Sequence, residues 1–312
     1  MRRFHRIVLS FFVVLILGVT GFVLWFFVFS REVPQDLSPL AEFAQKENYS
    51  ALIRRVQERP LGSEGFKFVV MGDSRSNLAV AREVFKQAVS EGPAFILSTG
   101  DIVRRGRVEE YVSYHIPLVE SVAPIPVIVA AGNHEEGPNK DFAAFEAIYG
   151  GDRFSFDYGG GRFVGVNNGD WGGMSGDDLS YLERELSKPG ATHKFVVFHV
   201  PPRFIPVHGD DGRGFRWNAG RFHALMKRQN VEQVFMGHVH GFHTMLRDGI
   251  RYTITAGGGA PLDQRLGPEG AVHNLVVVQV TPSGIRNEVV RLENSAWKRQ
   301  VINAEVGMPN AK

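Results

Sequence analysis

From residue 66 onward, short runs of apolar residues alternate with longer stretches in which apolar positions recur with a helical spacing. The apolar runs predict strands at 66–71, 95–98 and 126–131. The amphipathic stretches between them predict helices at 78–89, 108–119 and 142–148. Strands separated by helices of this length are typical of βαβ units, so we expect a buried and largely parallel sheet.

The pattern continues beyond residue 150 and then becomes richer in strands. Two runs at 154–158 and 162–166, joined by three glycines, predict a hairpin. Beyond it we expect helices and strands in alternation, at 179–186, 194–198, 222–228 and 233–236. The later apolar runs, separated by Gly and Pro turns, predict further strands. One α/β domain over 66–292 accounts for these elements, and 293–312 is expected to be a surface tail.

A different pattern occupies the N-terminus, where residues 7–29 carry no charged side chain. As a helix this run would be roughly 35 Å long at about 1.5 Å per residue, enough to cross a bilayer core of about 30 Å. It is too long for a cleaved signal peptide and lacks a small-residue cleavage site, so we expect a retained transmembrane anchor. Three arginines in residues 1–6 precede it, and the positive-inside rule keeps that end in the cytoplasm. The folded domain would then lie in a periplasm or outside the cell.

The segment between the anchor and the domain, residues 30–65, is expected to lie next to the membrane. Two prolines are followed by a helical pattern over 41–58, which Pro60 and Gly62 end. This pattern predicts a stalk or a packing helix.

The composition of the 312 residues excludes several classes of function. The chain has no cysteine, which rules out disulfide frameworks, thiolate metal sites and cysteine nucleophiles. The formal net charge is only +2, and the Lys and Arg residues are scattered along the sequence. No nucleic-acid partner is therefore expected, and a nuclease is disfavoured.

Residues that can bind a metal or a proton directly follow five of the predicted strands. The segments are MGDSR at 71–75, STGD at 98–101, AAGNHE at 130–135, VVFHV at 196–200 and FMGHVH at 235–240. In open α/β sheets, functional residues gather beyond the carboxyl ends of the strands. We therefore expect these distant segments to meet at one edge of the fold. Glycines precede several of the polar residues and suit a chain that turns sharply as a strand ends.

The candidate ligands at these strand ends are oxygen and imidazole groups, namely Asp73, Asp101, Asn133, His199, His238 and His240. Such a set suits metals such as Mn, Fe and Zn. A carboxylate can bridge two ions about 3.5–4 Å apart, and paired ions stabilise the attacking and leaving oxygens of an in-line displacement. This chemistry is phosphoester hydrolysis by a metal-bound hydroxide.

The order GD, GD, GNHE, H and GHxH resembles the calcineurin-like metallophosphoesterase superfamily, which includes the purple acid phosphatases. The motifs run from Asp73 to His240 and so cover more than half of the chain. The resemblance implies an α/β fold in which two mixed β-sheets pack as a sandwich flanked by helices.

The resemblance also implies roles for individual residues around two divalent or trivalent metal ions. Asp101 would bridge the ions, and the first site would be completed by Asp73 and His240. The second site would be completed by Asn133, His199 and His238. The proton donor to the leaving group would be His134, with Glu135 holding its imidazole in the useful tautomer.

One position departs from the resemblance. The commoner family pattern opens with D-x-H, whose His binds the first metal, but here that position is Arg75, which cannot ligate. Purple acid phosphatases replace this His by a Tyr three residues after the second Asp, and here that position is Arg104. Three interpretations stay open. The first site is occupied and completed by water or another ligand; or it is weak or empty; or Arg75 grips a substrate phosphate with its forked guanidinium.

Together these features predict a membrane-anchored, metal-dependent enzyme that hydrolyses a phosphomonoester or phosphodiester, either a small molecule or a lipid. Its catalytic residues would be His134, Glu135 and Arg75. The alternative is a catalytically weak or silent binding module on a phosphoesterase scaffold, and the arginine at position 75 is the feature that favours it.

Overall fold

The computed structural model describes residues 14–21, 33–169, 173–207 and 214–302. They fall into two compact units, residues 1–35 and 36–312, and each is considered by itself. In the first unit residues 14–21 are helical, whereas the rest of the predicted anchor, 7–13 and 22–29, lies outside the described residues. Within the described part of the chain, no helix is both long and apolar enough to cross a membrane.

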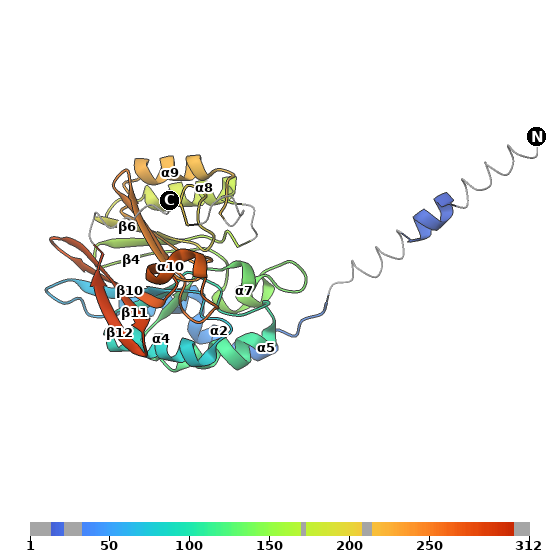
Figure 1. Ribbon diagram of the computed structural model, residues 1–312, viewed down its shortest axis with the longest axis horizontal. Helices are drawn as coiled ribbons and strands as arrows, with labels where there is room; N and C mark the ends of the chain where they lie inside the picture. Colours follow the sequence, from blue (N-terminus) through green and yellow to red (C-terminus); the bar gives the residue numbers. More distant parts are fainter. Residues whose placement is uncertain (1–13, 22–32, 170–172, 208–213, 303–312) are drawn as a thin grey trace, which may run out of the picture. The chain divides into compact units, whose positions relative to one another are not determined.

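Two mixed sheets, each of six strands, form the framework of the larger unit (Figure 1). The first has the order β12-β11-β10-β1-β2-β3. Its strands are β1 (Phe66–Met71), β2 (Phe95–Ser98), β3 (Val127–Val129), β10 (His273–Thr281), β11 (Gly284–Glu293) and β12 (Ala296–Val301). The strands β1, β2 and β3 run parallel, and β10, β11 and β12 pair antiparallel.

The second sheet has the order β4-β5-β6-β7-β9-β8. Its strands are β4 (Phe154–Tyr158), β5 (Gly161–Gly165), β6 (His193–Val197), β7 (Gln233–Met236), β8 (Phe242–Arg247) and β9 (Ile250–Thr255). The four central strands are parallel, and the edge strands β4 and β8 are antiparallel to their neighbours. The predicted α/β class with two mixed sheets is confirmed. The narrower expectation of one largely parallel sheet is wrong, because the parallel strands are divided between two sheets.

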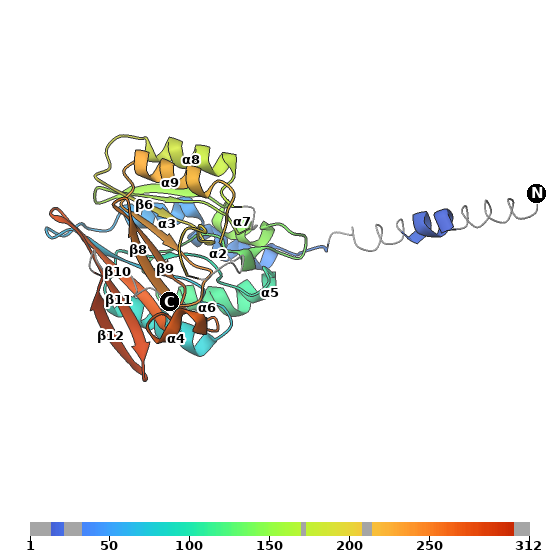
Figure 2. The same cartoon turned by 45° about the horizontal axis from the view of Figure 1, so that its top comes forward.

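Helices cover the sheets on their outer sides. Figures 1 and 2 show α8 (Gly176–Leu186) and α9 (Ala219–Arg228) against the second sheet, and α4 (Leu78–Ser90) against the first. The predicted helix at 108–119 is present as α5 (Val108–Glu110), a π-helical turn (Tyr111–His115) and α6 (Ile116–Glu120). Two further helices are α7 (Ala143–Tyr149) and α10 (Gly267–Gly270), and 3-10 turns lie at Ser38–Leu40, Asn133–Glu135 and Gln264–Leu266.

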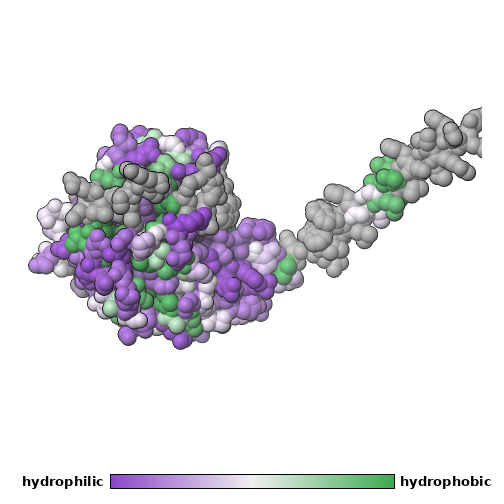
Figure 3. Space-filling view, viewed as in Figure 1, coloured by the Kyte–Doolittle hydropathy of each residue, from purple (hydrophilic) through white to green (hydrophobic). Residues whose placement is uncertain are grey.

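The parallel strands are buried on both faces, which explains why they read as continuous apolar runs. Alternate residues of β5, β6 and β7 point to opposite faces of the sheet. One face contributes Phe163, Phe195 and Phe235 to the larger core, and the other contributes Val164, Val196 and Val234 to the core beneath α8 and α9. In the core between the two sheets, the ring of Phe68 in β1 lies 5.1 Å from that of Phe163 and 5.3 Å from that of Phe195. The surface differs from this apolar core, since most of the coloured residues on the face of the larger unit in Figure 3 are hydrophilic.

The helical pattern at 41–58 forms two helices rather than one, α2 (Ala41–Glu47) and α3 (Tyr49–Gln57). They meet at Asn48, whose backbone is extended and whose side-chain oxygen accepts a hydrogen bond of 3.0 Å from the Ala51 N–H. An asparagine in this position caps the helix that follows it. Leu52 and Val56 are fully buried in the core, so this segment packs against the domain. The compact unit therefore begins at Asp36 and not at the predicted boundary of 66.

The predicted tail at 293–312 is also corrected, because residues 296–301 form β12 at the edge of the first sheet. Arg299 ties this strand to the domain through hydrogen bonds of 2.7 Å to both carboxylate oxygens of Glu91. Most residues of β12 are exposed, and the strand therefore lacks the apolar run on which the prediction relied. Residues 303–312 lie outside the described part of the chain.

Candidate metal centre

The predicted site residues lie together, at the carboxyl ends of strands from both sheets. Three segments follow β1, β2 and β3 of the first sheet, and they carry Asp73, Arg75, Asp101, Asn133, His134 and Glu135. Two segments follow β6 and β7 of the second sheet, and they carry His199, His238 and His240. Because the central strands of each sheet are parallel, their carboxyl ends lie on the same side, and the packing of the two sheets brings both sets into contact.

Three of these residues have a backbone conformation that residues other than glycine rarely adopt. The φ angles of Asp73, Asp101 and His238 are 56°, 55° and 71°. Such conformations cost energy and persist where the surrounding structure requires them, as at functional sites. The neighbouring glycines also serve close approach: a Cβ at Gly132 would lie 2.5 Å from a carboxylate oxygen of Asp101. These glycines therefore do more than permit the sharp turns predicted from the sequence.

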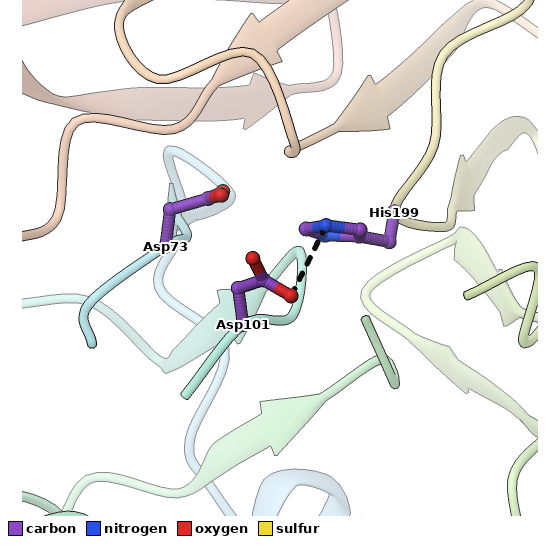
Figure 4. A group of neighbouring side chains, drawn as sticks. All are labelled: Asp73, Asp101 and His199. Carbon is purple, nitrogen blue, oxygen red and sulfur yellow. Dashed lines mark ion pairs between the residues drawn. The ribbon is translucent and has the colours of Figure 1, made fainter. Parts of the chain in front are cut away.

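Asp101 is the centre of the cluster. Its side chain is 1% exposed, and Oδ1 accepts a hydrogen bond of 3.1 Å from the His134 backbone N–H. The same oxygen lies 3.2 Å from Nε2 of His199. Figure 4 shows Asp73, Asp101 and His199 pointing toward one another from separate loops. Their ligand atoms all lie within 4.8 Å of one another, so this buried group could bind a metal ion.

The atoms around His199 fit a bound cation. Nδ1 of this ring donates a hydrogen bond of 2.8 Å to the carbonyl of Thr99, so Nε2 carries the lone pair in the neutral ring. Nε2 faces Oδ1 of Asn133 at 3.1 Å as well as the carboxylate of Asp101. Three acceptors therefore converge, an arrangement that a metal ion satisfies. His238 joins this group, with its Nδ1 2.9 Å from the same Asn133 oxygen.

The other side of Asp101 has a different arrangement. Nδ1 of His240 donates to the carbonyl of Pro261 at 2.7 Å, which leaves the Nε2 lone pair facing the site. That Nε2 lies 3.4 Å from Oδ1 of Asp73 and 3.2 Å from Nη2 of Arg75. The Nε of Arg75 donates to Oδ2 of Asp101 at 3.1 Å. On this side, therefore, a guanidinium lies between two of the predicted ligands of the first metal.

Burial and neighbouring charges set the protonation of these groups. Burial opposes ionisation of Asp101, but the positive charges of His199 and His134 in their protonated forms, together with that of Arg75, hold the pKa of this carboxyl at about 2. Burial, assisted by Asp101, raises the pKa of Asp73 well above its usual range. Burial also lowers the pKa of His199, and burial with the charge of Arg75 lowers that of His240 to about 4. Both rings are therefore neutral near pH 7, as a metal ligand requires.

His134 lies at the rim of the site, with its side chain 30% exposed. Its Nδ1 donates a hydrogen bond of 2.5 Å to the carbonyl of Arg104, and Nε2 lies 3.9 Å from Oδ2 of Asp101. The ring is thus held by a backbone carbonyl, with Nε2 turned toward the cluster. This geometry suits a group that exchanges a proton with a molecule bound beside Asp101.

Glu135 does not hold the ring of His134, and the role predicted for it is corrected. Its carboxylate is fully buried and accepts hydrogen bonds of 2.7–3.2 Å from four backbone N–H groups, those of Asp101, Ile102, Val103 and Gly132. Burial raises the pKa of this carboxyl, with a contribution from Asp101, but N–H donors on both oxygens favour the ionised form. Glu135 therefore fixes the two loops that carry Asp101 and Asn133.

Several groups that shape the site were not predicted. The carbonyls of Thr99, Arg104 and Pro261 orient three histidine rings, and no residue type marks a backbone carbonyl in a sequence. Asn168 also supports the site, because its Oδ1 accepts from the N–H groups of His199 and Val200 at 3.1 and 2.9 Å. An asparagine at the end of the hairpin was the signal that could have identified it.

Comparison with solved structures supports the fold. The chain superposes on GAP50, the anchor in the inner membrane complex of Plasmodium, with a TM-score of 0.60 and 15% identity, over 76% of this chain and 88% of that one. It superposes on the purple acid phosphatase PPD1 from yellow lupin (Lupinus luteus) seeds with a TM-score of 0.59 and 16% identity, over 77% and 54% of the two chains. Superposition on a dimetal phosphatase from Danio rerio gives a TM-score of 0.54 and 13% identity, over 77% of this chain and 99% of that one. At these identities the likeness shows the fold alone.

Sequence comparison is more specific. The probable glycerophosphodiester phosphodiesterase GpdQ of Arcobacter nitrofigilis is 26% identical over 170 residues, which are 51% of this chain and 60% of that relative. The match thus spans less than two thirds of the relative's length. The family model described as "Calcineurin-like phosphoesterase" matches residues 66–242, a range that contains all of the predicted site residues. The chain therefore belongs to the calcineurin-like phosphoesterase family.

Proposed function

We propose that this chain hydrolyses a phosphomonoester or phosphodiester with the help of metal bound at the strand ends. The observation that carries the proposal is the convergence of Nε2 of His199 with oxygens of Asn133 and Asp101, at 3.1 and 3.2 Å. The Nε2 lone pair of His199 faces these two oxygens, and a bound cation would compensate all three atoms. A bound metal ion would supply Lewis-acid activation of water and of the phosphoryl group.

The residues that would hold metal are those the motifs indicate. One group consists of Asp101, Asn133, His199 and His238, and a dinuclear centre would also need Asp73 and His240. The chain's own contribution to the reaction is then made by His134, whose ring is oriented by the Arg104 carbonyl. In its imidazolium form the ring would deliver the proton on Nε2 to the leaving oxygen as the P–O bond breaks, and the neutral ring would regain a proton from solvent.

The relative named as a glycerophosphodiester phosphodiesterase supports a diester as the first substrate to test. A phosphomonoester carries one more negative charge than a phosphodiester. Parallel assays of an aryl phosphodiester and an aryl phosphate show which of the two ester types the enzyme prefers. A lipid phosphoester and a soluble ester remain the two substrate classes of the proposal.

Removal of metal should abolish this activity. Dialysis of the full-length chain against a chelator is expected to reduce hydrolysis of both aryl esters to the background rate, and Mn, Fe or Zn should restore it. Metal content measured by plasma mass spectrometry should fall and recover in parallel. Undiminished hydrolysis after complete metal removal would contradict the proposal, and retained metal without hydrolysis of either ester would favour the silent binding module.

We further propose that the chain is anchored in a membrane by residues 7–29, with its N-terminus in the cytoplasm. The support for this is the uncharged run itself and the arginines that precede it. The full-length chain should remain in the membrane fraction after a high-salt wash, and a form that begins at Asp36 should not. Release of the full-length chain by salt alone would contradict the anchor.

A further inference from the structure

The acceptor atoms on the two sides of Asp101, one facing His199 and the other facing His240, have different surroundings. Beside His199, three acceptor atoms face one another, and a bound cation would compensate them. Beside His240, a cation belonging to the chain is already present, because Arg75 donates to Oδ2 of Asp101 and to Nε2 of His240. Oδ2 of Asp101 and the Nε2 lone pair of His240 thus each face a guanidinium N–H.

Arg75 is held firmly in this position. Its backbone N–H donates to the carbonyl of Asp101 at 3.2 Å, and Nη1 donates to the hydroxyl of Ser76 at 3.3 Å. Its side chain is 13% exposed and that of Asp101 only 1%. All three guanidinium nitrogens therefore have partners within the strand-end loops.

A first metal ion is incompatible with this arrangement. An ion bound by Asp101 and His240 would lie about 2.0–2.2 Å from the ligand atom of each. Nitrogens of Arg75 lie 3.1 and 3.2 Å from the same two atoms and so occupy the space between them. The guanidinium keeps its charge at any ordinary pH and would repel a second cation at such a distance.

We propose that the guanidinium of Arg75 takes the place of the first metal ion, so that this phosphoesterase holds one ion instead of two. The single ion would be bound by Asp101, Asn133, His199 and His238. This inference rests on the proposed metal-dependent activity and specifies its metal stoichiometry. A guanidinium has five N–H donors and three are used here, so two can contact an oxygen of the substrate phosphate.

The test counts metal ions in the full-length chain. After equilibration with Mn and removal of free ions, plasma mass spectrometry should find one Mn per wild-type chain, and its electron paramagnetic resonance spectrum should be that of an isolated ion. The substitution Arg75→His restores the D-x-H pattern and should raise the content to two ions per chain with a coupled spectrum. Arg82→His, on an exposed position of α4, is the matched control and should leave one ion.

Two ions in the wild type would overturn this inference while leaving the metal-dependent activity intact. One ion in both the wild type and Arg75→His would also overturn it, since Arg75 would then not be what excludes the second ion. No metal in the wild type would overturn the inference together with the proposed function. The wild-type spectrum alone decides between one and two ions, even if Arg75→His fails to fold.

Discussion

His134→Ala should lower the turnover number about 10²–10⁴-fold, the usual contribution of a positioned general acid, while the metal content stays unchanged. The ring of His134 lies beside Asp101 without being one of the acceptors that converge on the metal position, since its Nε2 is 3.9 Å from Oδ2 of Asp101. The loss should be larger for an alkyl ester than for an aryl ester, since a poor leaving group depends more on protonation. Steady-state rates with both esters and metal analysis of the same samples provide the measurement.

The matched control is His193→Ala. His193 is also a half-buried histidine. It is the first residue of β6, at the opposite end of the strand from His199, and it pairs with Glu232. This substitution should leave the turnover number within about twofold of the wild type, because it touches no residue of the centre. Equal losses of metal and turnover in His134→Ala would assign that residue to metal binding and contradict its role as proton donor.

Glu135→Gln should destabilise the fold by roughly 2–6 kcal/mol, because an amide has one acceptor oxygen where the carboxylate has two. Whichever way the amide is turned, its NH₂ faces two of the four backbone N–H groups that the carboxylate now satisfies. Two buried donors then lose their partner, each at a cost of about 1–3 kcal/mol. The free energy of unfolding measured by urea titration is the appropriate readout.

Glu136→Gln provides the control for this substitution. Glu136 is the next residue and pairs with Lys140, whose side chain is 81% exposed, and such surface pairs contribute about 0–1 kcal/mol. If Glu135 acted on the His134 ring, as the family resemblance implies, Glu135→Gln would lower turnover with little loss of stability. Similar unfolding free energies for the two variants would therefore contradict the structural role.

The elements of the domain could be predicted from the sequence to within a few residues. The strands around Phe68, Ile96 and Ile128 are buried on both faces, so their apolar runs are unbroken and easily recognised. Edge elements were harder to predict. The strand β12 is mostly exposed, and the break at Asn48 between α2 and α3 depends on a capping hydrogen bond within an otherwise helical pattern.

The candidate ligands could be predicted because their chemistry is local. A Gly-Asp or Gly-Asn-His after an apolar run places an oxygen or imidazole at the end of a strand whatever the rest of the fold does. That these ends belong to two different sheets could not be predicted, because strand order depends on packing between distant residues such as Phe68 and Phe195. Only this packing brings Asp101 and His199 within 3.2 Å.

By itself, the sequence determined the α/β class, the strand ends that carry polar residues and the family to which the chain belongs. The tertiary structure decided what the individual side chains contact. Glu135 binds backbone N–H groups rather than the His134 ring, and Arg75 spans Asp101 and His240. The physical reason is that a motif specifies residue types along one segment, whereas a hydrogen bond or a charge pair depends on the distance and direction between atoms of separate segments.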